Sequence, residues 1–214
     1  MLTLERLVYG NTPADEPPFA DVKAAPAVPI PTPPPFDRAP TWSPWAWLAG
    51  LWHKERSYWL DRAKNRPGAL AALHAAAVRR PRDLEVAAFY ASSLFEAGRE
   101  REALEVLHWR RAEHRRLGTL DFLEVPALAL IGLCYYQLAA PAHAAAWIDY
   151  ATEREAELGA SPTSLYARAI VLVSKGDLAG AGALLDRIEV EEPSFFFDRI
   201  TTLLGRVANG GAQV

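Results

Sequence analysis

The chain has 214 residues, half of them hydrophobic, which is enough to bury one sizeable core and argues against overall disorder. Its net charge of −3 provides no global basic field for nucleic acid or anionic lipid, and its single cysteine, Cys134, excludes an intramolecular disulfide framework. No apolar run approaches the roughly 18 residues that span a bilayer, and MLTLERLVYG lacks the pattern of an export signal, so we expect a cytoplasmic protein without a transmembrane segment.

Residues 1–42 are predicted to be an extended, proline-rich tail. Eleven of the seventeen prolines fall between Pro13 and Pro44, and proline lacks the backbone donor that helices and central strands need. Two PxxP spacings occur in this tail, so it could serve as a ligand for a groove in another protein. The alternatives are a plain linker, or a segment that lies across the domain or across a partner. Ahead of the prolines, Leu4 and Leu7 share one helical face, so this end could act as a short docking peptide.

Residues 43–214 are predicted to be one helical domain. Ser43 followed by Pro44 is typical of a helix N-cap with proline at the first helical position. Turn signals such as KNRPG, RRPRD, EAGRE, LGASPTS and SKGD then alternate with alanine- and leucine-rich segments of helical length. This alternation predicts an all-α chain of helical hairpins.

Three segments of this domain align with one another, starting at Leu84, Val125 and Pro162. They share a small residue in the first helix, a turn residue, and an alanine in the second helix. In chain order these are Ala91, Gly132 and Ala169; Gly98, Ala139 and Gly176; and Ala103, Ala144 and Ala181. A small residue lets two helices approach closely.

This pattern resembles the tetratricopeptide (TPR) repeat, a helical hairpin of roughly 34 residues. An earlier hairpin, ending at Pro81, fits the same pattern. The resemblance implies a right-handed superhelical solenoid of about four TPR-like hairpins, with FFFDRITTLLGRVA as a C-terminal capping helix. Arg110 and Arg115 stand where the family has alanine and proline, so we expect that second helix to run long, to about Gly118.

Motifs for catalysis or cofactor binding are not found in the sequence. The five histidines form no common metal spacing, and neither a nucleophile elbow nor a glycine-rich phosphate loop is present. We therefore expect no enzyme activity and no cofactor.

The family resemblance implies that a partner protein or peptide binds on the concave surface formed by the first helices. The residues implied for this surface are Phe95, Leu133, Tyr136, Tyr166, Ile170 and Val173. They suit a hydrophobic helix or extended strand, although they could instead contact the next repeat. The expected function is a non-enzymatic adaptor or assembly subunit that uses this groove, the tail, or both, with homo- and hetero-oligomers both open.

Four arginines, Arg110, Arg111, Arg115 and Arg116, are predicted to form a basic ridge on one helix. Glutamates interleave with them, which favours a solvated face over an acidic protein partner, and disfavours nucleic acid. Binding of nucleic acid or another regulatory ligand through this ridge is the alternative function that the composition leaves open.

Five of the seven tryptophans lie in TWSPWAWLAGLWHKERSYWL. Trp52 and Trp59 have the seven-residue separation of two core positions in the repeat, so we expect them in the core of the first hairpin, with its turn one residue longer than the others. Trp45 and Leu48 continue the same face and could cover the open N-terminal end of the solenoid, which leaves Trp42 and Trp47 as the exposed residues for a contact with a partner or with lipid. Peripheral association with a membrane through this segment is the second alternative function.

Overall fold

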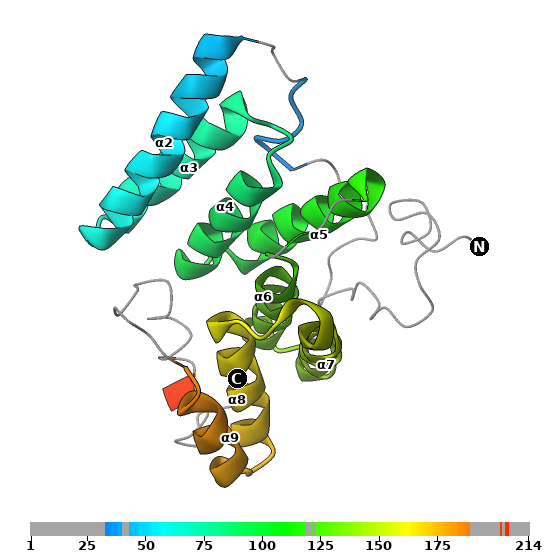
Figure 1. Cartoon of the computed structure of the whole chain (residues 1–214). Helices are drawn as coiled ribbons and strands as arrows, with labels where there is room; N and C mark the ends of the chain where they lie inside the picture. Colours follow the sequence, from blue (N-terminus) through cyan, green and yellow to red (C-terminus); the bar gives the residue numbers. More distant parts are fainter. Residues whose placement is uncertain are drawn as a thin grey trace. The chain divides into compact units, whose positions relative to one another are not determined.

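The computed structural model describes residues 33–39, 43–118, 121, 123–188, 202, 204 and 205. Within these residues the fold is all-helical, as predicted, and contains no strand (Figure 1). The docking peptide with Leu4 and Leu7, residue Trp42 and most of the predicted capping helix lie outside the described residues. The helices are α2 (Pro44–Arg62), α3 (Arg66–Arg79), α4 (Leu84–Glu96), α5 (Glu100–Leu117), α6 (Glu124–Gln137), α7 (Pro141–Leu158), α8 (Pro162–Ser174) and α9 (Leu178–Leu185).

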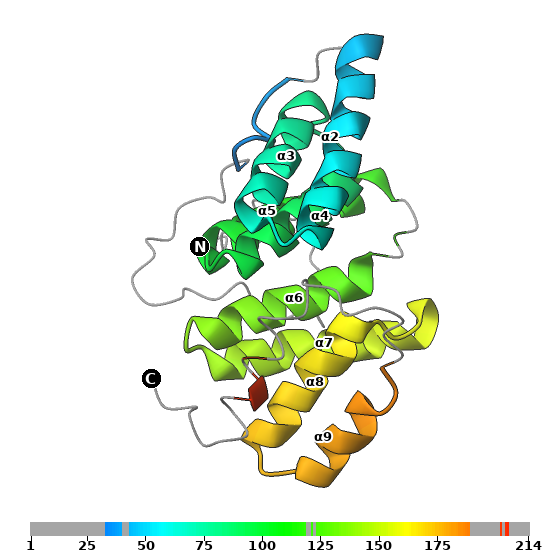
Figure 2. The same ribbon diagram turned by 90° about the vertical axis from the view of Figure 1, so that its left-hand side faces the viewer.

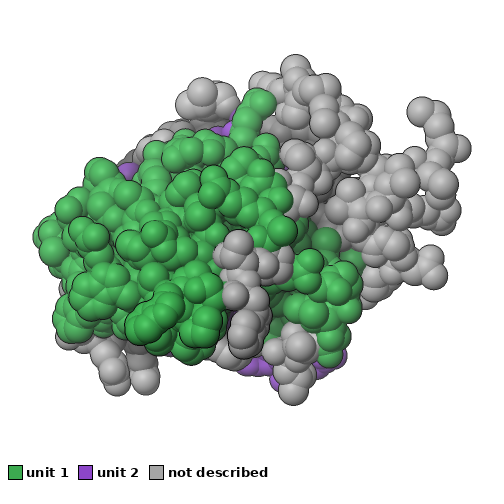
Figure 3. All heavy atoms as spheres, turned by 90° about the horizontal axis from the view of Figure 1, so that it is seen from above, with its two compact units in different colours: residues 1–15, 23–121 green, residues 16–22, 122–214 purple. Residues whose placement is uncertain are grey.

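The helices fall into two compact units, coloured separately in Figure 3. Unit 1 contains α2 to α5, in which α2 pairs with α3, α3 contacts α4, and α4 pairs with α5 (Figure 2). Unit 2 contains α6 to α9, in which α6 pairs with α7 and α8 pairs with α9, while α8 also contacts α6 and α7. Each pair is a helical hairpin of residues adjacent in sequence.

The four hairpin turns have the same backbone geometry. Each turn has three residues, and its middle residue has a positive φ: Lys64 (60°), Gly98 (78°), Ala139 (57°) and Gly176 (83°). The next residue donates its N–H to the carbonyl five positions back, as Arg99 does to Leu94 at 2.9 Å. This left-handed C-terminal cap satisfies carbonyls that the helix end leaves without partners. The prediction that Gly98, Ala139 and Gly176 occupy the turns is confirmed.

The N-terminal ends of α2 and α4 and the C-terminal end of α5 follow the capping chemistry that their sequences favour. The Ser43 hydroxyl accepts the N–H of Ala46 at 3.4 Å, and Pro44 is the first residue of α2. Asp83 accepts the N–H groups of the second and third residues of α4, each at 3.0 Å. The predicted long helix is also confirmed, because α5 continues to Leu117 and ends at Gly118 in the left-handed conformation.

The close approach of paired helices depends on the small residue that the repeats share. A Cβ placed on Gly132 of α6 would lie 2.5 Å from Cγ1 of Ile148 and 3.0 Å from the carbonyl oxygen of Ala144, both on α7. Ala91 and Ala169, the equivalents in α4 and α8, are completely buried. A larger side chain at this position would separate the two helices of a hairpin.

The predicted register of the first hairpin is wrong. Its turn has three residues like the other turns, so the small position falls on Ser57, five residues before the end of α2, as Ala91 lies five residues before the end of α4. Ser57 is buried, whereas Trp52 and Trp59 are 66% and 65% exposed. One residue corresponds to a 100° rotation around a helix, which turns both tryptophans away from α3.

Candidate functional site

The described end of the proline-rich tail packs into unit 1. The N–H of Phe36 donates to the carbonyl of Pro33 at 2.7 Å, which closes a turn over residues 33–36. The Phe36 ring is buried and stacks on Trp109 of α5, with ring centroids 4.5 Å apart, and lies 6.1 Å from the ring of Tyr90 on α4. Aromatic contacts of this kind contribute about 0.5–1.5 kcal/mol beyond the area they bury. Phe36 therefore anchors this turn.

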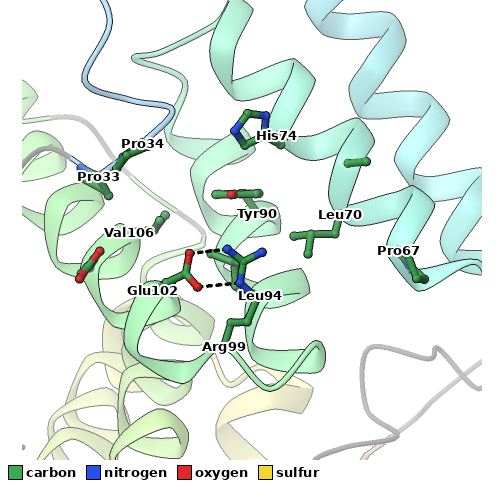
Figure 4. Close-up of a pocket in the computed structure, with 12 residues that line it drawn as sticks. Pro33, Pro34, Pro67, Leu70, His74, Tyr90, Leu94, Arg99, Glu102 and Val106 are labelled. Atoms are coloured by element: carbon green, nitrogen blue, oxygen red, sulfur yellow. Dashed lines mark hydrogen bonds and ion pairs between the residues drawn. The ribbon is translucent and has the colours of Figure 1, made fainter.

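A cavity of about 490 Å³ adjoins the turn, and we call it the α3–α5 groove (Figure 4). It belongs entirely to unit 1 and is lined by three helices, the α4–α5 turn and the tail. The lining residues are Pro33, Pro34, Pro67, Leu70, Ala71, His74, Tyr90, Leu94, Arg99, Glu102, Glu105 and Val106. In Figure 4 the prolines of the tail lie on the side opposite Pro67 and Leu70.

The local sequence explains why these side chains share one groove. On α3, Pro67, Leu70, Ala71 and His74 follow one another at the spacing of a single helical face, as Glu102, Glu105, Val106 and Trp109 do on α5. Tyr90 and Leu94, one helical turn apart on α4, form the floor between them. The α3 face is largely open to solvent, whereas Tyr90 and Leu94 are buried. The groove thus has an apolar floor and an accessible wall.

An ion pair lies at the end of the groove formed by the α4–α5 turn. Arg99 donates from Nε to Oε1 of Glu102 at 2.6 Å and from Nη2 to Oε2 of the same carboxylate, so the pair is bidentate (Figure 4). The hydrogen bond to Glu102 raises the pKa of Arg99. Because both side chains are partly exposed, we assign this pair a contribution of at most about 1 kcal/mol to stability. It forms a charged end of a groove that His74 and Glu105 also line.

Two side chains of the groove, Tyr90 and Glu105, have pKa shifts that favour their neutral forms. Burial raises the pKa of Tyr90. Burial also raises the pKa of Glu105, and the negative charge of Glu102 adds to that shift. A protonated Tyr90 phenol offers a hydrogen-bond donor beside the apolar floor. The groove can therefore combine apolar contact with recognition of a carbonyl oxygen.

The residues predicted for a concave binding surface are distributed differently. Phe95 is in unit 1, is buried and does not line the α3–α5 groove. The other five are in unit 2, where Leu133 and Ile170 are buried and Tyr136, Tyr166 and Val173 are half-buried. Burial of three of the six residues matches the alternative that these side chains serve packing.

The predicted basic ridge is not a continuous surface. Arg110 and Arg111 are buried. Arg110 donates to the carbonyl of Leu84 at 2.9 Å and is paired with Asp121. Arg115 is half-buried, and exposed Arg116 forms a forked pair with Glu113 at 2.8 and 2.6 Å. An arginine can bury its aliphatic stem in a core while its guanidinium pairs with a polar partner. The number of arginines in this helix therefore overestimates the charge that it exposes.

Trp47 lies at the start of α2 and is half-exposed, with the Arg80 guanidinium 5.4 Å from its ring centroid. This cation–π contact links α2 to the end of α3. It gives Trp47 a structural contact in addition to its exposed surface.

Sequence reasoning missed Phe36, Tyr90 and Trp109 as parts of one site. The only available signals were an isolated phenylalanine after a run of prolines and the helical spacing of the groove residues on α3 and α5. No group of three or more histidine, cysteine, aspartate or glutamate side chains among the described residues is placed to hold a metal ion. None of the described helices is both long and apolar enough to cross a membrane.

Comparisons of the chain with protein-family models, with curated proteins and with solved structures find no match.

Proposed function

We propose that the chain is a non-enzymatic protein-interaction module, an adaptor or assembly subunit, whose α3–α5 groove binds an extended, proline-containing segment of a partner protein. One observation carries this proposal: the chain's own Pro33–Phe36 turn packs at one end of the groove, where Pro33 and Pro34 line it and Phe36 contacts Tyr90 and Trp109. A surface that packs against prolines and the aromatic ring that follows them in its own chain is suited to bind a segment of the same composition from a partner protein.

The chemistry of the groove favours such a segment. Proline-rich chains are already extended and lose little conformational entropy on binding, so aromatic-lined grooves recognise them well. Tyr90 supplies an aromatic surface and a phenol donor, while Leu70, Leu94 and Val106 supply apolar contact. The continuation of the tail towards the N-terminus carries two PxxP spacings, so the chain's own tail and a partner segment would compete for the groove.

We further propose that the four hairpins are TPR-like repeats arranged as a right-handed solenoid. Their identical three-residue turns and the shared small position at Ser57, Ala91, Gly132 and Ala169 support a repeated unit. A crystal structure in which the hairpin α4–α5 does not stack on the hairpin α6–α7 would contradict this arrangement.

The peptide-binding proposal can be tested with a fluorescent synthetic peptide, APAVPIPTPPPF, which copies residues 25–36. Fluorescence anisotropy would measure its affinity for the full chain and for a Phe36→Ala variant. The variant vacates the aromatic site, so the peptide should bind it more tightly than it binds the unchanged chain. The same peptide ending in alanine should bind both chains weakly.

A matched pair of variants tests whether the α3–α5 groove is the binding site. Leu70→Asp, made in the Phe36→Ala chain, places a charge on the apolar wall and should weaken peptide binding at least about tenfold, because the charge loses water without gaining a partner. Phe89→Asp changes a residue of α4 that is exposed and does not line the groove. Equal peptide affinities for the two variants would exclude the groove as the site.

A further inference from the structure

The outer face of α2 carries a row of exposed apolar side chains, Trp45, Leu48, Trp52 and Trp59, which we call the tryptophan face. Trp45 is 80% exposed, Leu48 is half-exposed, and Trp52 and Trp59 are about two-thirds exposed. Soluble surfaces carry single apolar residues routinely, but a contiguous row of indoles on one helix indicates a contact with a partner or a membrane.

The geometry of α2 makes this row continuous. Its members follow Trp45 at intervals of three, seven and fourteen residues, which places them on one side of the helix over about 21 Å. Gly50 and Ser57, the buried residues of α2, lie on the opposite side, and α3 is the helix against which α2 packs (Figure 1). The face is therefore directed away from the packing surface of unit 1.

The chemistry around the row matches an anionic lipid surface. Indole rings have an apolar body and a polar N–H, and they concentrate at the boundary between acyl chains and water. The exposed charged residues of α2 and of the turn that follows it are Glu55, Arg56, Arg62 and Lys64. Three of these four are basic, so the rim of the face is positive although the whole chain has a net charge of −3. Positive rims on apolar helix faces attract anionic headgroups.

A second copy of the chain fits the same face less well. Two helices that pair as a coiled coil need apolar residues at both alternating positions of their interface. Trp45, Trp52 and Trp59 would fill one position, but the other would be filled by Leu48, Glu55 and Arg62. Pairing would bury a glutamate and an arginine in the interface, whereas at a bilayer surface both can reach water and headgroups.

We propose that α2 lies along the surface of an anionic bilayer, with its tryptophan face in the headgroup region. This site is separate from the α3–α5 groove, so it would place the interaction module at a membrane surface.

Vesicle sedimentation with the full chain tests the proposal. Vesicles of phosphatidylcholine with about one quarter phosphatidylserine should pellet the chain, and vesicles of phosphatidylcholine alone should pellet much less. The triple variant Trp45→Ser, Trp52→Ser, Trp59→Ser should lose at least about tenfold in binding, with an unchanged helical circular dichroism spectrum because these side chains are exposed. Replacing Arg56 by Gln should weaken binding about fivefold.

Controls separate the tryptophan face from general apolar exposure and from self-association. Leu178→Ser removes a side chain of α9 that is exposed to a similar degree, and it should leave vesicle binding unchanged. Lipids brominated near the headgroup should quench tryptophan fluorescence of the original chain. Failure to bind anionic vesicles, equal binding by the triple variant, or a dimer in analytical ultracentrifugation that depends on the tryptophans and replaces vesicle binding would overturn the proposal.

Discussion

Gly132 of α6 offers the sharpest test of how the hairpins pack. Replacing glycine by alanine within a helix usually stabilises it by about 1 kcal/mol, because alanine loses less conformational entropy. At Gly132, however, the new Cβ would lie 2.5 Å from Cγ1 of Ile148 and 3.0 Å from the Ala144 carbonyl oxygen. The backbone carbonyl cannot rotate away, so α6 and α7 must separate, and such overpacking costs about 1–3 kcal/mol. We expect the overpacking to prevail, with a net loss of about 1–2 kcal/mol.

Urea denaturation followed by circular dichroism would measure this change, and the melting temperature should fall by about 2–8 °C. Gly182→Ala is the matched control, because Gly182 lies within α9 and its added Cβ meets no atom within 4 Å. This control should raise the free energy of unfolding by up to about 1 kcal/mol. Adding Ile148→Ala to Gly132→Ala should destabilise the chain by less than the sum of the two single changes. Equal stabilities of the two glycine variants would refute the assigned approach of α6 to α7.

Three further changes have expected outcomes. Ala139→Gly should raise the melting temperature slightly, as calorimetry would measure, because Ala139 holds a left-handed φ of 57° that costs alanine about 1 kcal/mol more than glycine; a lower melting temperature would argue against relief of strain. Asp121→Asn should lower the free energy of unfolding, measured with urea, by about 3 kcal/mol, because it removes one charge of the buried pair with Arg110. Glu113→Gln, in the exposed pair with Arg116, should change it by less than about 1 kcal/mol, and similar losses for the two variants would contradict this ranking. Burial, with a smaller effect of Arg111, holds the pKa of His108 well below its ordinary 6.5. As the pH falls through about 6.5, the unfolded chain therefore binds a proton at His108 that the folded chain does not bind, and the free energy of unfolding decreases. His108→Leu should reduce this loss of stability between pH 7.5 and 5.5, and an unchanged dependence on pH would count against this role of His108.

Much of the helical framework could be predicted because its signals are local. The N-cap at Ser43, the turns at Gly98 and Gly176 and the end of α5 at Gly118 depend on capping hydrogen bonds or on positive φ, which only a few residue types provide well. The shared small residue of the hairpins α4–α5, α6–α7 and α8–α9 was also visible in the sequence, because close helix packing restricts that position, whereas Ser57 of the first hairpin was not recognised.

The candidate binding surfaces were decided by contacts that sequence periodicity does not encode. Phe36 and Trp109 are far apart in the chain, and no local pattern predicts that their rings stack. Arg110 and Arg111 have the composition of a basic surface, yet the fold buries both side chains. Long side chains can be apolar or polar contacts depending on which atoms the neighbours cover.

The tryptophans of α2 show which features the sequence determines and which only the tertiary structure determines. The sequence alone determines that this segment is a helix and that Trp45, Trp52 and Trp59 share one face, since their spacing is a multiple of seven. It does not determine which way that face points, because a turn shorter by one residue rotates α2 by 100° relative to its partner. Only the packing of α2 on α3 settled this point, by selecting Gly50 and Ser57 for the interior, where small side chains permit close contact, and leaving the indoles outside.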